Sequence, residues 1–200
     1  MRLTAGDARR QNMDDTLSMG ELVEPLNFDS IWATEHYDPA YSMQPNPVQY
    51  SAYWAGRTNR VDMGIAVIVA PWWNLVRLAH AISKLNILLE GRCFHLAIGL
   101  GIAPHECGSL GYPVEQSHKY FYDVANAIRA ADGAERFEFQ GDVYNIPSTS
   151  IRPQARHEGE LTKDIKMAFT TEASTKLAAE NGLGQMFVAG DDVAAMTDKV

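Results

Sequence analysis

The chain has few cysteines, no cluster of positive charge and no long hydrophobic run. Cys93 and Cys107 form neither a CxxC pair nor a metal-ligand spacing, so we expect reduced thiols and no metal site. Lysine and arginine number 17 against 25 acidic residues, and the net charge of −8 argues against general nucleic-acid binding. No apolar stretch reaches the roughly 18 residues of a membrane span, and the opening residues lack the apolar core of a signal peptide. These absences predict a cytoplasmic protein with no nucleic-acid or membrane partner.

The composition is that of a globular protein. Hydrophobic residues make up 46% of the chain and charged residues 21%. A length of 200 residues suits one domain, and no repeat, low-complexity tract or Pro/Ser-rich linker divides it. We therefore expect a single domain over residues 1–200.

The stretch 60–101 organises the rest of the sequence. Residues 64–70 are an almost unbroken apolar run rich in β-branched side chains, which is typical of a strand buried on both faces. Apolar residues at helical spacing follow over 75–89, with Asn74 as the expected N-cap, and 96–98 give a second short strand. This order predicts a right-handed βαβ crossover in a parallel sheet, with the functional edge where the strands end.

The other segments extend this alternation. Residues 1–12 are expected to form a loop, and 13–26 show a weak helical pattern that Gly20 and Pro25 interrupt. The remaining predicted elements are a strand at 30–34, a helix at 48–57 started by Asn46 and Pro47, a helix at 115–131, a strand at 165–169, a helix at 174–181, a strand at 185–189 and a helix beginning in 191–200.

One segment departs from the parallel pattern. Residues 137–144 alternate around Gly141 and Asp142, which predicts a small antiparallel β-hairpin inserted near 137–145. The rest of the pattern predicts an α/β fold, either a doubly wound sheet or part of a (β/α)₈ barrel. The five strands of the series are too few to close such a barrel.

Several segments, taken in order, resemble those of the bacterial-luciferase-like, flavin-dependent monooxygenases. They are NFDSIWATEHYDP, MGIAVIVAP, VRLAHAISKLNILLEGR, LAIGLGIAPHE, FQGDVYNIP, IRPQA and MAFTTEASTKLAAENG, and together they span about residues 27–190. The resemblance implies a (β/α)₈ TIM-barrel type of fold, with flavin at the carboxyl ends of the strands.

The resemblance also implies roles for particular residues. His36 occupies the place of the active-site histidine beside the flavin, where an imidazole can give or take a proton at neutral pH, and Glu35 is the acidic residue before it. Solvated loop residues after a strand are the alternative interpretation. Ala66 and Val67 would form an apolar floor under the flavin ring, and ordinary core packing accounts for them equally well.

The phosphate of the cofactor is expected at a third segment. Thr170, Thr171 and Ser174 match the turn where the family holds this phosphate, and free N–H groups at a helix N-terminus suit an anion. Plain N-capping by Thr171 or Ser174 is the alternative. Leu100 replaces an arginine that reaches the phosphate in many relatives, which puts phosphate affinity in doubt.

The length also departs from the family. No clear strand precedes Met13, and family members continue through two further strand–helix units, so the barrel is expected to be incomplete. A fragment, an open edge covered by a partner subunit, and a degenerate relative are three competing explanations.

The implied activity is oxygenation of a small organic substrate by reduced FMN and O₂, with the reduced flavin supplied by a separate reductase. F420 is the alternative cofactor, and a non-catalytic homologue is the alternative function. Trp72 and Trp73 either line the pocket or pack in the core. A homodimer is expected because the family commonly pairs and because an open barrel needs covering.

Overall fold

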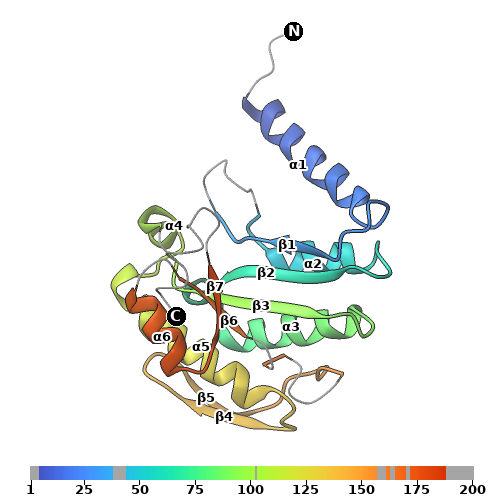
Figure 1. Cartoon of the computed structure of the whole chain (residues 1–200). Helices are drawn as coiled ribbons and strands as arrows, with labels where there is room; N and C mark the ends of the chain where they lie inside the picture. Colours follow the sequence, from blue (N-terminus) through green and yellow to red (C-terminus); the bar gives the residue numbers. More distant parts are fainter. Residues whose placement is uncertain are drawn as a thin grey trace.

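The protein is built on a parallel sheet of five strands in the order β1-β2-β3-β6-β7, with a separate two-stranded sheet β4-β5 (Figure 1). The computed structural model describes residues 5–37, 44–101, 103–156, 161–162, 165–169 and 172–187. Its elements are α1 (Ala5–Leu22), β1 (Ser30–Ala33), α2 (Pro47–Ala55), β2 (Asp62–Val69), the 3-10 helix η1 (Ala70–Trp72), α3 (Leu75–Leu88), β3 (Phe94–Gly99), α4 (Pro104–Ser109), the 3-10 helix η2 (Val114–Gln116), α5 (Ser117–Ala131), β4 (Phe137–Gln140), β5 (Asn145–Thr149), β6 (Lys166–Phe169), α6 (Glu172–Glu180) and β7 (Gly184–Phe187).

The predicted alternation of strands and helices is confirmed for the described residues. Asn46 and Asn74 cap α2 and α3, accepting the N–H groups of Gln49 at 2.9 Å and Arg77 at 3.1 Å. The strand predicted at 185–189 is seen as β7, and the helix expected in 191–200 lies outside the described residues.

The core lies between the sheet and the helices α2, α3 and α5. Ile65 and Ile68 of β2 and Ile98 of β3 are fully buried, and they belong to one apolar cluster with residues of all three helices. Burying a side chain of this size stabilises a fold by about 1.5–3 kcal/mol, so this cluster fixes the sheet on its helices.

Helix α1 corrects the prediction for the start of the chain. The helix runs without interruption from Ala5 to Leu22, through residues expected to be loop and through Gly20. A Cβ atom at Gly20 would lie 2.0 Å from the ring of Trp54, so the glycine allows α1 to pack closely on α2. Pro25 follows the helix and does not break it. Figure 1 shows the amino-terminal part of α1 extending away from the sheet.

The predicted hairpin is confirmed and is longer than expected. Strands β4 and β5 pair antiparallel, and the second strand continues to Thr149. The loop 141–144 between them is held by Asp123 of α5, which is 4% exposed and accepts the N–H groups of Asp142 at 3.1 Å, Val143 at 2.8 Å and Tyr144 at 2.8 Å. A buried carboxylate with three donors thus anchors the insertion to the main fold.

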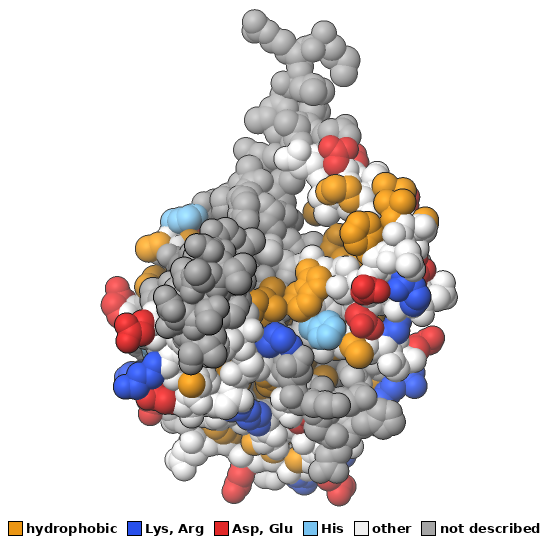
Figure 2. Space-filling view, viewed as in Figure 1, with side chains coloured by type: hydrophobic (Ala, Val, Ile, Leu, Met, Phe, Trp, Pro, Cys, Tyr) orange, Lys and Arg blue, Asp and Glu red, His pale blue; other side chains and the backbone are white. Residues whose placement is uncertain are grey.

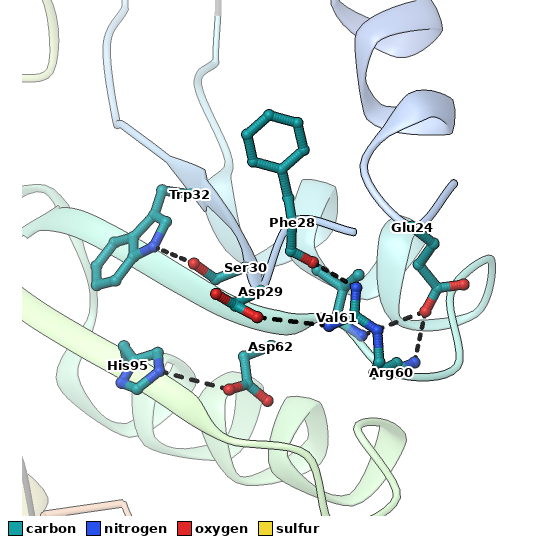
Figure 3. A network of polar contacts seen from close by, with 9 residues as sticks. All are labelled: Glu24, Phe28, Asp29, Ser30, Trp32, Arg60, Val61, Asp62 and His95. Carbon is teal, nitrogen blue, oxygen red and sulfur yellow. Dashed lines mark hydrogen bonds and ion pairs between the residues drawn. The ribbon is translucent and has the colours of Figure 1, made fainter. Parts of the chain in front are cut away.

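A polar network closes the amino-terminal end of β1 and β2 (Figure 3). Oε1 of Glu24 accepts the N–H groups of Asn59 at 2.7 Å, Arg60 at 2.5 Å and Val61 at 3.3 Å. The guanidinium of Arg60 donates to the carbonyl of Phe28 at 2.7 Å. The network orders the turn that leads into β2, and it lies at the end of the sheet where the strands begin.

The face of the sheet opposite the core carries an aromatic pair. The rings of Trp32 and His95 stack with centroids 5.4 Å apart, and Nε2 of His95 lies 3.8 Å from a carboxylate oxygen of Asp62. The space beneath Trp32 is available because Gly64 has no side chain, since a Cβ there would lie 2.3 Å from the indole. Trp32 remains 43% exposed.

Exposed apolar side chains gather beside this pair. Figure 2 shows hydrophobic side chains on the surface formed by the end of α1, the turn after it and β1. The residues concerned are Met19, Leu22, Leu26, Phe28 and Trp32, all of them classed as exposed. These five side chains form an exposed apolar surface over the end of α1, the turn after it and β1.

Both cysteines are free thiols: Cys93 is exposed just before β3, and Cys107 is buried in α4. Among the described residues, no helix combines the length and the apolar character that a membrane crossing requires. The same residues contain no group of three or more metal-binding side chains.

Candidate functional site

The candidate site lies where the parallel strands end. Glu35 and His36 follow β1, and β1 pairs in parallel with β2, so both residues lie at the carboxyl edge of the sheet. The N–H of Val69, the last residue of β2, donates to Oε2 of Glu35 at 2.7 Å. This is the edge at which α/β enzymes place ligands.

Glu35 is a buried acid that holds its proton. Its side chain is 2% exposed, and Oε1 accepts the indole N–H of Trp73 at 2.7 Å. Burial raises the pKa of Glu35 to about 8, and the charge of Glu106 acts in the same direction, while the hydrogen bonds from Val69, Trp73 and Tyr37 oppose the rise in pKa. Because Glu35 is buried, the alternative of a solvated loop carboxylate is wrong for this residue. At neutral pH the carboxyl group of Glu35 is protonated in most molecules.

His36 is held beside a second buried carboxylate. Its backbone N–H donates to the carbonyl of Gln44 at 3.1 Å, and its side chain is 28% exposed. Nδ1 of the ring lies 3.4 Å from Oε1 of Glu106, which is 2% exposed at the start of α4. The same oxygen accepts the N–H of Tyr37 at 2.6 Å. The chain thus brings an imidazole and two carboxyl groups together from the segment after β1 and from α4.

Sequence reasoning assigned no role to Glu106. It is the last residue of the segment LAIGLGIAPHE and lies in α4, the helix that follows β3. Its contacts with the 35–37 segment cross about 70 residues of sequence, a separation that no local pattern encodes. The available signal was its position: an acidic residue following a buried parallel strand, at the same edge as Glu35.

Two tryptophans after β2 take different roles. Trp72 is buried in a cluster with Cys107 and Val69, and its ring packs edge-on against Tyr37 with centroids 5.3 Å apart. Core packing is therefore its role. Trp73 donates to Glu35 and accepts, through its carbonyl, the O–H of Tyr144 at 2.8 Å. Burial, followed by the charge of Glu35, raises the pKa of Tyr37 to about 12, so this phenol stays neutral.

Ala66 and Val67 lie in β2 and are half-buried. Ala66 pairs with Ala97 and Ile68 with Ile98, which leaves Val67 as an extra residue in the strand. A β-bulge of this kind re-aims the side chains next to it. The peptide bond between Ala66 and Val67 is cis. Their proposed place under a flavin ring stays a prediction.

The expected phosphate segment is described only in part. Thr170 and Thr171 lie outside the described residues. Ser174 is half-buried and stands third in α6, so the interpretation of Ser174 as an N-cap is wrong. Helix α6 follows β6, and β6 is parallel to the strands that lead to Glu35, so this helix begins at the same edge of the sheet. Glu172, exposed in the first turn, places a negative charge where an anion would bind.

The family model of the luciferase-like monooxygenases matches residues 1–200. The oxygenase component of a flavin-dependent trigonelline monooxygenase from Acinetobacter baylyi is 23% identical over 183 residues, covering 90% of this chain and 50% of that protein. An F420-dependent glucose-6-phosphate dehydrogenase from Microbacterium testaceum is 24% identical over 196 residues, covering 94% of this chain and 56% of that protein.

Solved structures agree on the fold. The monooxygenase RslO1 from Streptomyces bottropensis superposes with a TM-score of 0.84 at 24% identity, covering 96% of this chain and 58% of that one. The α/β fold is thus of the (β/α)₈ type, with five parallel strands described here. This chain spans about half the length of the curated relatives that it matches. The match over the whole chain and the shared fold show that the protein belongs to the luciferase-like monooxygenase family.

Proposed function

We propose that this chain forms the cofactor-binding part of a monooxygenase that uses reduced FMN and O₂ to oxygenate a small organic substrate. The observation that carries the proposal is the group formed by Glu35, His36 and Glu106 at the carboxyl edge of a parallel sheet. Such a group can supply and remove protons beside a bound ring system.

The residues present fit a flat, apolar ring. Gly99, the last residue of β3, has no side chain, and the half-buried Ala66 of β2 has a small one. Bound flavin would supply the redox chemistry. We assign to His36 the transfer of a proton to or from the bound molecules. Trp73, which donates to Oε1 of Glu35, shields this carboxyl group from water, and the Glu35 pKa of about 8 preserves a neutral proton donor.

The alternative cofactor is F420, and the alternative function is binding without catalysis. A relative named as F420-dependent matches as much of the chain as the flavin-dependent one does. Leu100, in place of the family's arginine, and Glu172, in the first turn of α6, both weaken the case for a tightly held phosphate. A separate flavin reductase, suggested by the name of a relative that is an oxygenase component, and a homodimer complete the proposal.

A direct test begins with absorbance titrations of the protein with FMN and with F420. We expect saturable FMN binding and O₂ consumption once the flavin is reduced. His36→Ala should lower turnover by about 100-fold or more while flavin affinity stays within about 3-fold. Binding without turnover would favour the non-catalytic alternative, and preference for F420 would replace FMN. Absence of binding to both cofactors would refute the proposal.

A further inference from the structure

Glu106 holds the 36–37 segment at two points with one oxygen atom. Oε1 lies 3.4 Å from Nδ1 of His36 and accepts the backbone N–H of Tyr37 at 2.6 Å. One contact orients the ring and the other fixes the backbone that carries it. Since Glu106 is 2% exposed and Tyr37 packs on Trp72, neither contact competes freely with water.

Glu106 also carries the negative charge of the site. Glu35 has a pKa of about 8 and is largely neutral at pH 7, and the negative charge of Glu106 is one cause of that rise in pKa. Among the described residues, the titratable nitrogen that lies beside either carboxyl group is Nδ1 of His36, 3.4 Å from Oε1 of Glu106, and this contact is an ion pair when the imidazole is protonated. The negative charge of the two carboxyl groups therefore lies beside the imidazole of His36.

We propose that Glu106 is a positioning residue that acts through His36, accepting the Nδ1 proton of the ring and leaving Nε2 as the nitrogen that exchanges protons with bound molecules. An isolated neutral imidazole prefers to carry its proton on Nε2, so the tautomer expected here has to be imposed by a neighbour. A buried carboxylate next to Nδ1 is the group that imposes it. The consequence for turnover rests on the proposed function, whereas the tautomer does not.

The first measurement reads the tautomer directly, without cofactor. In protein labelled with ¹⁵N-histidine, long-range ¹H–¹⁵N spectra should show His36 protonated on Nδ1, with the signal assigned by its loss in His36→Gln. In Glu106→Leu, which offers no acceptor, we expect the Nε2–H pattern. His80 should keep its signals and serve as an internal reference, because its Nδ1 lies 2.8 Å from the carbonyl of Val76 in α3.

The second measurement is a double-mutant cycle on turnover. Glu106→Gln keeps the size and an acceptor for the Tyr37 N–H and removes the charge, so we expect kcat to fall by about 10- to 100-fold with KM and flavin affinity within about 3-fold. In Glu106→Gln/His36→Gln we expect no further loss beyond His36→Gln alone, because Glu106 acts through the ring. Glu106→Asp should recover part of the rate.

The outcomes separate the two proposals. An Nε2–H tautomer in the wild-type protein, or a pattern unchanged in Glu106→Leu, would overturn the positioning role whether or not flavin binds. Additive losses in the double mutant would overturn it as well. Failure to bind flavin, with the expected tautomer change intact, would overturn the proposed function alone. If Glu106→Leu does not fold, Glu106→Ala carries the same spectral comparison because it also offers no acceptor, and a wild-type pattern in that variant would again overturn the role.

Discussion

Glu35 makes the stability of this protein depend on pH in a direction opposite to that of most carboxyl groups. Its pKa is raised from 4.5 to about 8 in the folded protein, so the folded state binds a proton that the unfolded state has released. The free energy of unfolding therefore falls as pH rises from about 4.5 to about 8. The difference of about 3.5 pKa units corresponds to about 5 kcal/mol at most, since each unit is worth 1.36 kcal/mol.

Replacing Glu35 by Gln removes this dependence. At pH 5 the variant should be slightly less stable than the wild-type protein, because an amide does not satisfy the Val69 and Trp73 donors equally well. At pH 8.5 it should be more stable than the wild-type protein. Urea unfolding followed by circular dichroism at half-unit steps should show the difference between the two proteins change by several kcal/mol over this range.

A matched control is Glu24→Gln at the opposite end of the sheet. The backbone hydrogen bond from Arg60 lowers the pKa of Glu24, so its contribution to stability is present above pH 4.5 and is lost at lower pH. Its difference from the wild-type protein should stay flat between pH 5 and 8.5. A flat difference for Glu35→Gln as well would refute the assignment of a buried, protonated acid.

Three further changes test the structure at other points. Gly20→Ala should destabilise the protein by about 1–3 kcal/mol in urea unfolding, because the added Cβ would lie 2.0 Å from the Trp54 ring. Asp123→Ala should cost about 2–4 kcal/mol in the same assay, because three N–H groups of the hairpin loop lose their acceptor. Trp73→Phe removes a donor that lowers the pKa of Glu35, so the pH-dependent loss of stability should move to higher pH.

Gly20→Ala has a comparison within the chain, and each of the other two changes has an outcome that would contradict the reasoning. Gly56→Ala adds the same methyl group where the nearest atom would be 3.8 Å away, and an effect as large as that of Gly20→Ala would contradict the packing argument. An Asp123→Ala protein as stable as the wild type would mean that water replaces the lost carboxylate. For Trp73→Phe, an unchanged pH profile would remove the indole from the environment that sets the Glu35 pKa.

The elements that the sequence predicted best are those with local signals. The helix α3 has its apolar spacing and its Asn74 cap within one short segment, and the strands on either side of it are buried apolar runs. The predicted extent of α1 was wrong at Gly20, because this glycine lets α1 pack closely on Trp54 of α2, and that contact joins distant segments of the sequence. Propensity alone treats such a glycine as a helix breaker, and tertiary packing overrides it.

The candidate site shows the same division. Glu35 and His36 were predicted, and the structure places both at the carboxyl edge of the sheet with Glu35 buried. Their catalytic roles, and the roles of Ala66, Val67, Thr170, Thr171 and Ser174 toward a cofactor, stay predictions. Glu106 was missed because its significance comes from tertiary folding, which brings α4 against the segment after β1. A linear pattern records residue types and does not record such distances.

The hairpin β4-β5 has a further consequence for how this scaffold tolerates change. Asp123 clamps its loop, and the Tyr144 hydroxyl reaches the carbonyl of Trp73, whose indole in turn contacts Glu35. An insertion without contacts to the candidate site can be shortened or exchanged between homologues with no effect on the site residues. This hairpin is linked to Glu35 through Tyr144 and Trp73. Replacing it with a different hairpin should therefore change the pKa of Glu35.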